Sequence, residues 1–183
     1  MRAHHAFALS VALLSLAAPA AAQQPNLFTG VDVMSATVLQ EGQSSFSGLG
    51  LRVRLRPETV VKNLEFMPSI EYWRNSSTVS PYNIRSTRKD GTLAMDVRYS
   101  FHPHGWQPYV GAGYGIHFLS SRVNAPALGL NEATDSLVKG GLAALAGVTF
   151  GLSKRLDNFI EVKYHHIPGY RQLKINWGLA VKL

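Results

Sequence analysis

Residues 93–118, LAMDVRYSFHPHGWQPYVGAGYGIHF, decide the fold class of this chain. Every second residue is apolar in two runs, and a short His-Pro-His-Gly segment separates them. This period-two alternation predicts two β-strands joined by a turn. The positions between the apolar residues hold Asp96, Arg98 and several glycines. One face of the hairpin is therefore apolar, and the other is polar or nearly bare.

The same alternation recurs on both sides of this hairpin. The further strands that it predicts lie at residues 26–39, 49–55, 64–72, 142–150, 160–164 and 175–183. The whole chain after its first segment thus predicts eight strands. Pro68 falls inside the third strand and cannot donate to a ladder, so we expect a bulge or a local break there.

Charged residues occupy the middle of the strands, on the face that lacks aliphatic side chains. They are Asp32, Arg52, Arg54, Glu65, Glu71, Asp96, Arg98, Glu161, Lys163 and Lys174. A membrane barrel turns apolar side chains to lipid and polar ones to its lumen, and its closure satisfies every backbone group. The pattern predicts an all-β fold, an eight-stranded antiparallel transmembrane β-barrel. A soluble, lipocalin-like barrel with the aliphatic face around a ligand is the alternative.

The predicted lumen holds five cations and five anions. Side chains fill the interior of an eight-stranded barrel, and unpaired buried charges are very costly. We therefore expect a salt-bridged plug, with a path for protons or ions as the alternative. His117 and His165 should point into this plug and form hydrogen bonds there.

The chain begins with an export signal. Residues 1–22 combine Arg2, an apolar run and an Ala-Ala-Ala cleavage site before Gln23. The apolar run is too short for a bilayer core of about 30 Å. We expect a cleaved signal peptide at 1–22, a barrel at 23–183 and a place in the outer membrane of a Gram-negative bacterium. The chain has no cysteine, which excludes disulfides and thiol nucleophiles.

The predicted connections differ between the two ends of the barrel. Short inner turns are expected at 56–63, 102–107 and 153–157, and outer connections at 40–44, 75–91, 121–137 and 167–172. Aromatic residues mark the strand ends, with Tyr72, Phe118 and Tyr164 at the outer ends and Tyr99, Phe101, Trp106 and Phe150 at the inner ends. Two long outer loops and two aromatic belts are typical of outer-membrane barrels.

Cations gather in the predicted outer loops. Arg85, Arg88, Lys89, Arg122 and Arg171 are candidate ligands for the phosphates of outer-leaflet glycolipid, because arginine makes bidentate contacts with phosphate. Simple solvation of mobile loops is the alternative. The net charge of +7 could also suggest nucleic acid, but export and the lack of a basic stripe exclude that partner.

The end of the chain resembles the C-terminal assembly signal of bacterial outer-membrane barrels. Asn176, Gly178, Val181 and Leu183 occupy the positions of that signal, with Leu183 in place of the usual terminal aromatic residue. Residues 107–115, QPYVGAGYG, and 147–152 also look like segments of the small outer-membrane barrel superfamily. The resemblance implies recognition by the barrel assembly machinery and contact with outer-membrane lipid and lipopolysaccharide.

A second resemblance concerns activity. Residues 96–121 and 159–168 resemble the lipid A deacylases, eight-stranded outer-membrane esterases with a His-x-Ser motif and a downstream Glu. The resemblance places His166 at the catalytic base. Pro168 stands where the nucleophilic serine is required, and no acidic residue follows Glu161. A hydroxyl needs an imidazole base and an orienting acid to attack an ester.

The sequence therefore predicts a non-enzymatic outer-membrane protein, structural or surface-binding through its outer loops. A lipid A acyl-ester hydrolase that uses His166 is the alternative, and a transporter with a lateral opening near Pro68 is a third reading. No cofactor is expected, and no metal, because His102 and His104 lack a third ligand. We expect a monomer.

Overall fold

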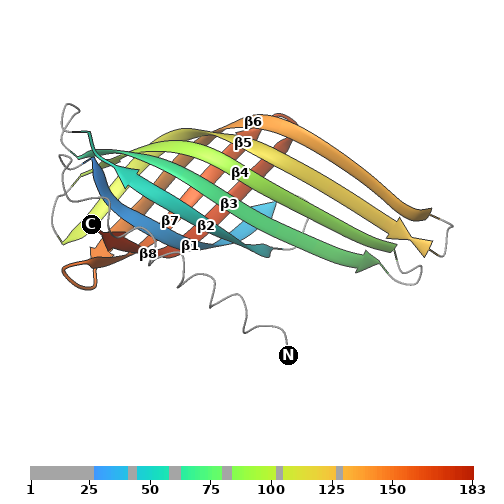
Figure 1. The fold of residues 1–183 in the computed structure, drawn as a ribbon, viewed down its shortest axis with the longest axis horizontal. Coiled ribbons are helices and arrows are strands. Elements are labelled where there is room, and N and C mark those ends of the chain that lie inside the picture. The colour runs from blue at the N-terminus through green and yellow to red at the C-terminus, as the bar shows by residue number, and fades with distance from the viewer. Residues whose placement is uncertain (1–26, 41–44, 58–62, 80–83, 102–104, 127–129) are drawn as a thin grey trace.

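A computed structural model of the chain describes residues 27–40, 45–57, 63–79, 84–101, 105–126 and 130–183. These residues form one closed barrel in which each strand pairs with its neighbours in the sequence and the last strand pairs with the first (Figure 1). The strands are β1 (Phe28–Gln40), β2 (Phe46–Leu55), β3 (Leu64–Val79), β4 (Ile84–Ser100), β5 (Trp106–Ala125), β6 (Leu130–Gly151), β7 (Leu156–Ile167) and β8 (Tyr170–Lys182). Within the described residues, no helix is long and apolar enough to cross a membrane.

All strand pairs are antiparallel, and β1 closes the barrel against β8 from Gly30 and Lys182 to Gln40 and Gln172. The apolar positions of the alternation face outward and are exposed, for example Leu49 at 65 % and Leu142 at 65 %. Such an outward apolar surface with a closed ladder suits a hydrocarbon surrounding. The predicted eight-stranded antiparallel membrane barrel is thus confirmed.

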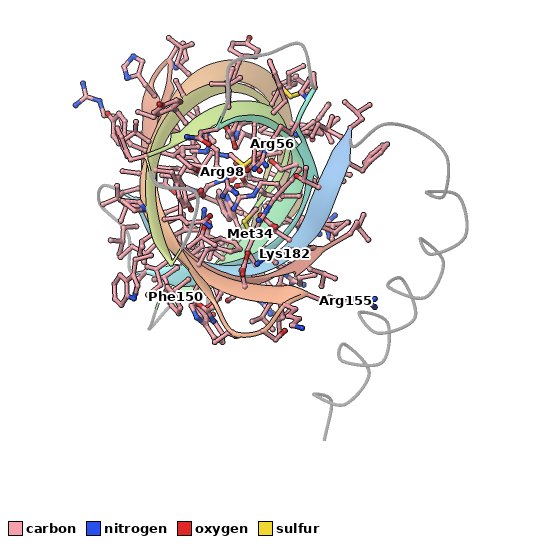
Figure 2. The ribbon with its side chains drawn as sticks, turned by 90° about the vertical axis from the view of Figure 1, so that its left-hand side faces the viewer. Met34, Arg56, Arg98, Phe150, Arg155 and Lys182 are labelled. Carbon is pink, nitrogen blue, oxygen red and sulfur yellow. The ribbon has the colours of Figure 1, made fainter. Side chains whose placement is uncertain are left out.

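The interior is filled by the charged side chains that the sequence assigns to the lumen. All ten of them are buried, and apolar clusters such as Met34, Phe159 and Ala180 lie among them. Figure 2 looks into the barrel from the end of the inner turns, with Arg98 and Met34 inside the wall and Arg155 outside it. The orientation of both faces follows the prediction.

The irregularity expected at Pro68 is found on one side of β3 only. It pairs regularly with Met95 of β4, but the ladder between β2 and β3 is interrupted where Pro68 would meet Val53. The register is the same on both sides of the gap, as the pairs Arg52–Ser69 and Leu55–Phe66 show. The missing amide hydrogen therefore breaks the ladder locally without a bulge.

The prediction of two long outer loops at 75–91 and 121–137 is wrong. β3 and β4 continue as a paired ladder to Val79 and Ile84, and β5 and β6 continue to Ala125 and Leu130. β2 pairs with β3 only as far as Trp73, so these four strands project beyond the rest of the outer end (Figure 1). Residues 75–78 and 85–89 of this sheet are polar on both faces, so the sequence shows no apolar alternation that would mark them as strand.

Candidate anion-binding surface and barrel interior

The projecting sheet carries a row of cations on its outer face. Trp73 and Asp90 are buried and point inward, so the next residues along each strand, Arg74 and Lys89, point outward and are exposed. Arg74 is the direct register partner of Lys89 across β3 and β4. Cross-strand partners have their Cβ atoms about 5 Å apart, so both charges can reach one anion.

Hydroxyl groups separate this row from two further cations nearer the tip. Ser76 Oγ lies 3.1 Å from Thr87 Oγ1, and Arg85 Nε donates to Ser76 Oγ at 3.4 Å. Arg122 on β5 is the register partner of Thr87. The outer face of β3–β5 thus alternates guanidinium and ammonium groups with hydroxyl donors, and both kinds of group bind phosphate oxygens.

The first cation row lies next to the outer aromatic belt. Tyr72 and Phe118 both pair with Gly91, and their side chains are about half exposed on the outward face. Aromatic belts mark the membrane interface of outer-membrane barrels. Arg74 and Lys89 lie two residues beyond Tyr72 and Gly91, about 7 Å along the strands. This is the first outward row above the belt, where lipid headgroups lie.

The five predicted phosphate ligands do not form one site. The structure brings Arg85, Lys89 and Arg122 to the outer face of β3–β5. Arg88 alternates to the other face, where it pairs with Asn75 and Ser121. Arg171 lies on β8, on the opposite wall of the barrel, across from His166 of β7.

Arg74 belongs to this surface and was missed from the sequence, because it falls between the predicted strand at 64–72 and the predicted loop at 75–91. Asp90 and Asp135, two carboxylates of the projecting hairpins, alternate to the inner face. Among the described side chains, the outer face of the projecting part of β3–β5 carries no carboxylate. Arg74 and Lys89 thus place two positive charges side by side on this face.

The interior charges are linked in networks of salt bridges. Arg52 lies between Asp32 and Glu161, with Nε 3.0 Å from Asp32 Oδ2 and Nη1 2.9 Å from Glu161 Oε2. Glu161 also accepts hydrogen bonds from the Tyr109 hydroxyl and the Asn176 amide. The pairing expected for a structural plug is found here.

A second group of interior charges lies closer to the outer end. Lys163 Nζ lies 2.9 Å from Glu71 Oε1 and 2.7 Å from Asp96 Oδ2. Lys174 Nζ lies 2.5 Å from Glu71 Oε2. Each of these buried ammonium groups thus has a carboxylate partner, as burial of a charge requires.

The two interior histidines differ. His117 Nδ1 lies 2.9 Å from Asp90 Oδ2 and 3.0 Å from Thr92 Oγ1, so it is the hydrogen-bonded plug residue that the sequence predicts. His165 is fully buried, but neither ring nitrogen has a hydrogen-bond partner among the described residues. Its ring packs edge-on against His117 at 5.1 Å, so the expectation of a hydrogen bond is wrong for His165.

His166, the base of the hydrolase alternative, is exposed on the outer wall of β7. Its register partners are Leu142 on β6 and Arg171 on β8. Pro168 lies in the turn that follows, where its carbonyl accepts a hydrogen bond from Lys139 at 2.8 Å. Neither register partner of His166 carries a hydroxyl or a carboxylate.

The sequence predicts no metal site, because His102 and His104 lack a third ligand. His102 and His104 lie outside the described residues. In the ranges that are described, no group of three or more His, Cys, Asp or Glu side chains is arranged to hold a metal ion.

The residues of the C-terminal signal lie along β8. Asn176 points inward to Glu161, and Gly178 faces the ring of Phe159. Val181 is half-buried and Leu183 is exposed. The signal therefore combines two positions that fill the lumen with two that reach the inner end of the barrel.

Comparison with known proteins agrees with this architecture. The family described as the outer membrane protein beta-barrel domain matches residues 6–182. Among curated proteins, none matches the sequence. Among solved structures, Neisserial surface protein A is similar with a TM-score of 0.62 and 18 % identity, over 85 % of this chain and 96 % of that one.

Two further barrels have the same fold. Ail of Yersinia pestis, solved in complex with the heparin analogue sucrose octasulfate, gives a TM-score of 0.62 at 14 % identity over 85 % of this chain and 98 % of that one. A major outer membrane protein of Thermus thermophilus gives 0.63 at 15 % identity, over 85 % and 99 %.

Proposed function

Because the chain belongs to the outer membrane protein β-barrel domain family, we propose that it is a non-enzymatic protein of the bacterial outer membrane that binds phosphorylated glycolipid on its outer wall. The binding surface is the outer face of β3–β5, with Arg74 and Lys89 at the headgroup level and Arg85 and Arg122 above them. The projecting hairpins present this surface and take the place of the long loops that the sequence predicts.

The register pairing of Arg74 with Lys89 carries the proposal. Like charges directly opposite each other across two strands destabilise a sheet. A phosphate between them converts this repulsion into two charge-assisted contacts. The position directly above the exposed Tyr72 favours a phosphate that is attached to a membrane lipid.

A protein of similar fold supports an oxyanion of a sugar as the class of ligand. Ail of Yersinia pestis was solved with a polysulfated sugar, an analogue of heparin. Sulfate and phosphate esters of sugars share an oxyanion that arginine and lysine bind. We take a phosphorylated sugar as the matching ligand for this chain, because its cations lie next to the membrane interface.

The hydrolase alternative has no such support. His166 is outward and reachable by an acyl chain, but its neighbours across the strands are Leu142 and Arg171. Ester attack requires an activated nucleophile and an acid that orients the base. We therefore assign no catalytic role to His166.

The test is equilibrium binding of fluorescent, phosphorylated lipid A to the protein in phosphatidylcholine nanodiscs. We expect the R74Q/K89Q double variant to bind about tenfold more weakly than the wild type. The matched control is K154Q/R155Q, which removes two exposed cations from the turn at the inner end. Equal binding by wild type and R74Q/K89Q would refute the proposal.

A further inference from the structure

A polar hollow lies on the wall opposite the Arg74–Lys89 row, at the outer tip of β7 and β8. It has a volume of about 360 Å³. Its lining residues are Gln40, His166, Ile167, Pro168, Gly169, Tyr170 and Arg171. The lining contains a histidine and an arginine but no carboxylate, so the hollow offers charge to an anion.

His166 and Arg171 face each other across the ladder. They are direct register partners at the ends of β7 and β8, and both are exposed on the outward face. Side chains of such partners start about 5 Å apart, within reach of one small ligand. One imidazole and one planar guanidinium can then donate to the same oxyanion.

The turn between the two residues is held in place. Pro168 fixes its own φ, and Gly169 adopts a φ of +77°, which glycine takes without strain. Lys139, from β6, donates to the Pro168 carbonyl at 2.8 Å and spans the gap between β6 and the turn. The turn therefore fixes the spacing of His166 and Arg171 and brings the Lys139 ammonium close to the hollow.

The hollow lies at the edge of the lipid-facing surface. The next row toward the membrane consists of Leu39, Leu173 and Tyr164, which are register partners on β1, β8 and β7. Leu39 is 38 % exposed and Tyr164 is 40 % exposed on the outer wall. A ligand held by His166 and Arg171 thus has polar atoms above this row and room for acyl chains along it.

We propose that His166 and Arg171 bind a single phosphate group of an outer-leaflet lipid, as a second site on the opposite wall. The inference rests on the proposed function for the identity of the ligand, but it uses none of the β3–β5 cations. The two sites contact separate lipid molecules, because β4 and β8 lie on opposite sides of the closed barrel.

The groups around His166 suit an anionic ligand. Arg171 faces it from β8, and the Lys139 ammonium lies on β6. No described carboxylate faces it. An imidazole N–H donates to a phosphate oxygen, and the guanidinium adds a charge-assisted contact.

The test compares wild type with H166A and R171Q in phosphatidylcholine nanodiscs that contain fluorescent, phosphorylated lipid A. We expect each variant to bind about fivefold more weakly than wild type, because each loses one donor to the phosphate. Binding by both variants equal to that of wild type would overturn the proposal.

Two further arms separate this site from the first and from free phosphate. In the R74Q/K89Q background, H166A and R171Q should still weaken binding by the same factor. No effect of H166A and R171Q in that background would overturn the second site and leave the first intact. Full displacement of the lipid by an excess of inorganic phosphate would overturn the assignment to a lipid headgroup, whereas retention of the lipid supports it.

Discussion

Arg74 of β3 lies directly opposite Lys89 of β4, with both side chains on the outer face of the barrel wall. Neither residue belongs to the buried salt bridges that pair charges inside the lumen. Two like charges in direct register oppose folding by a few tenths of a kcal/mol up to about 1 kcal/mol. In the proposed function, a bound phosphate offsets this repulsion.

The first prediction concerns stability without lipid. K89Q should unfold at the same or a higher urea concentration than the wild type in an uncharged detergent, with a gain of up to about 1 kcal/mol. Addition of phosphorylated lipid A should stabilise the wild type more than K89Q, because ligand binds the folded state. A K89Q protein that is markedly less stable in detergent alone would show that Lys89 has a structural role.

A second prediction concerns the salt bridge between Arg52 and Glu161 inside the barrel. Both side chains are buried, so E161Q leaves a guanidinium with one partner fewer and should reduce the free energy of unfolding by about 3 kcal/mol. R52M/E161Q should be destabilised by less than the sum of the single variants. Arg56, which is half exposed and pairs with Glu65, is the control, and R56Q should change stability by about 1 kcal/mol or less. Additive effects of R52M and E161Q would contradict the pairing.

The third prediction concerns a close approach inside the wall. A Cβ at Gly178 would lie 2.5 Å from the Val33 carbonyl oxygen and 2.6 Å from the Phe159 ring. G178A should therefore be destabilised by about 1–3 kcal/mol. Refolding into detergent is the measurement, because it requires no assembly machinery and isolates packing from signal recognition. G91A is the control, since nothing lies within 4 Å of its added Cβ. Equal stability of G178A and wild type would contradict this packing.

The fourth prediction addresses catalysis. Expression of the wild-type protein in the outer membrane should leave the mass of lipid A unchanged, because no nucleophile accompanies His166. Mass spectrometry of extracted lipid A from cells with and without the protein is the measurement. Loss of one acyl chain with wild type and not with H166A would establish the hydrolase instead.

The barrel wall could be predicted from the sequence because one face of each strand is apolar. Leu93 and Met95 alternate with Ala94 and Asp96, and the structure exposes the first pair and buries the second. The sequence also predicts that the interior charges pair with one another. Which carboxylate joins which cation could not be predicted, because the pairs connect strands far apart in the chain, such as Arg52 and Glu161.

The candidate site was harder to predict than the wall. Residues 75–78 and 85–89 are polar on both faces, so periodicity predicts no strand there. Without the strands, the parity that separates Arg88 from Lys89 was invisible, and Arg74 had no partner. Register sets the site, and register comes from backbone pairing that the side-chain pattern of a fully hydrated sheet does not specify.

The measurement that tests the central claim most directly is native mass spectrometry of the protein extracted from the outer membrane in mild detergent. The account predicts that wild type and K154Q/R155Q retain bound phosphorylated glycolipid, whereas R74Q/K89Q loses most of it. Dephosphorylated glycolipid should be retained by none of the three proteins. Equal retention of the phosphorylated lipid by wild type and R74Q/K89Q would contradict the assignment of the Arg74–Lys89 face as its binding surface.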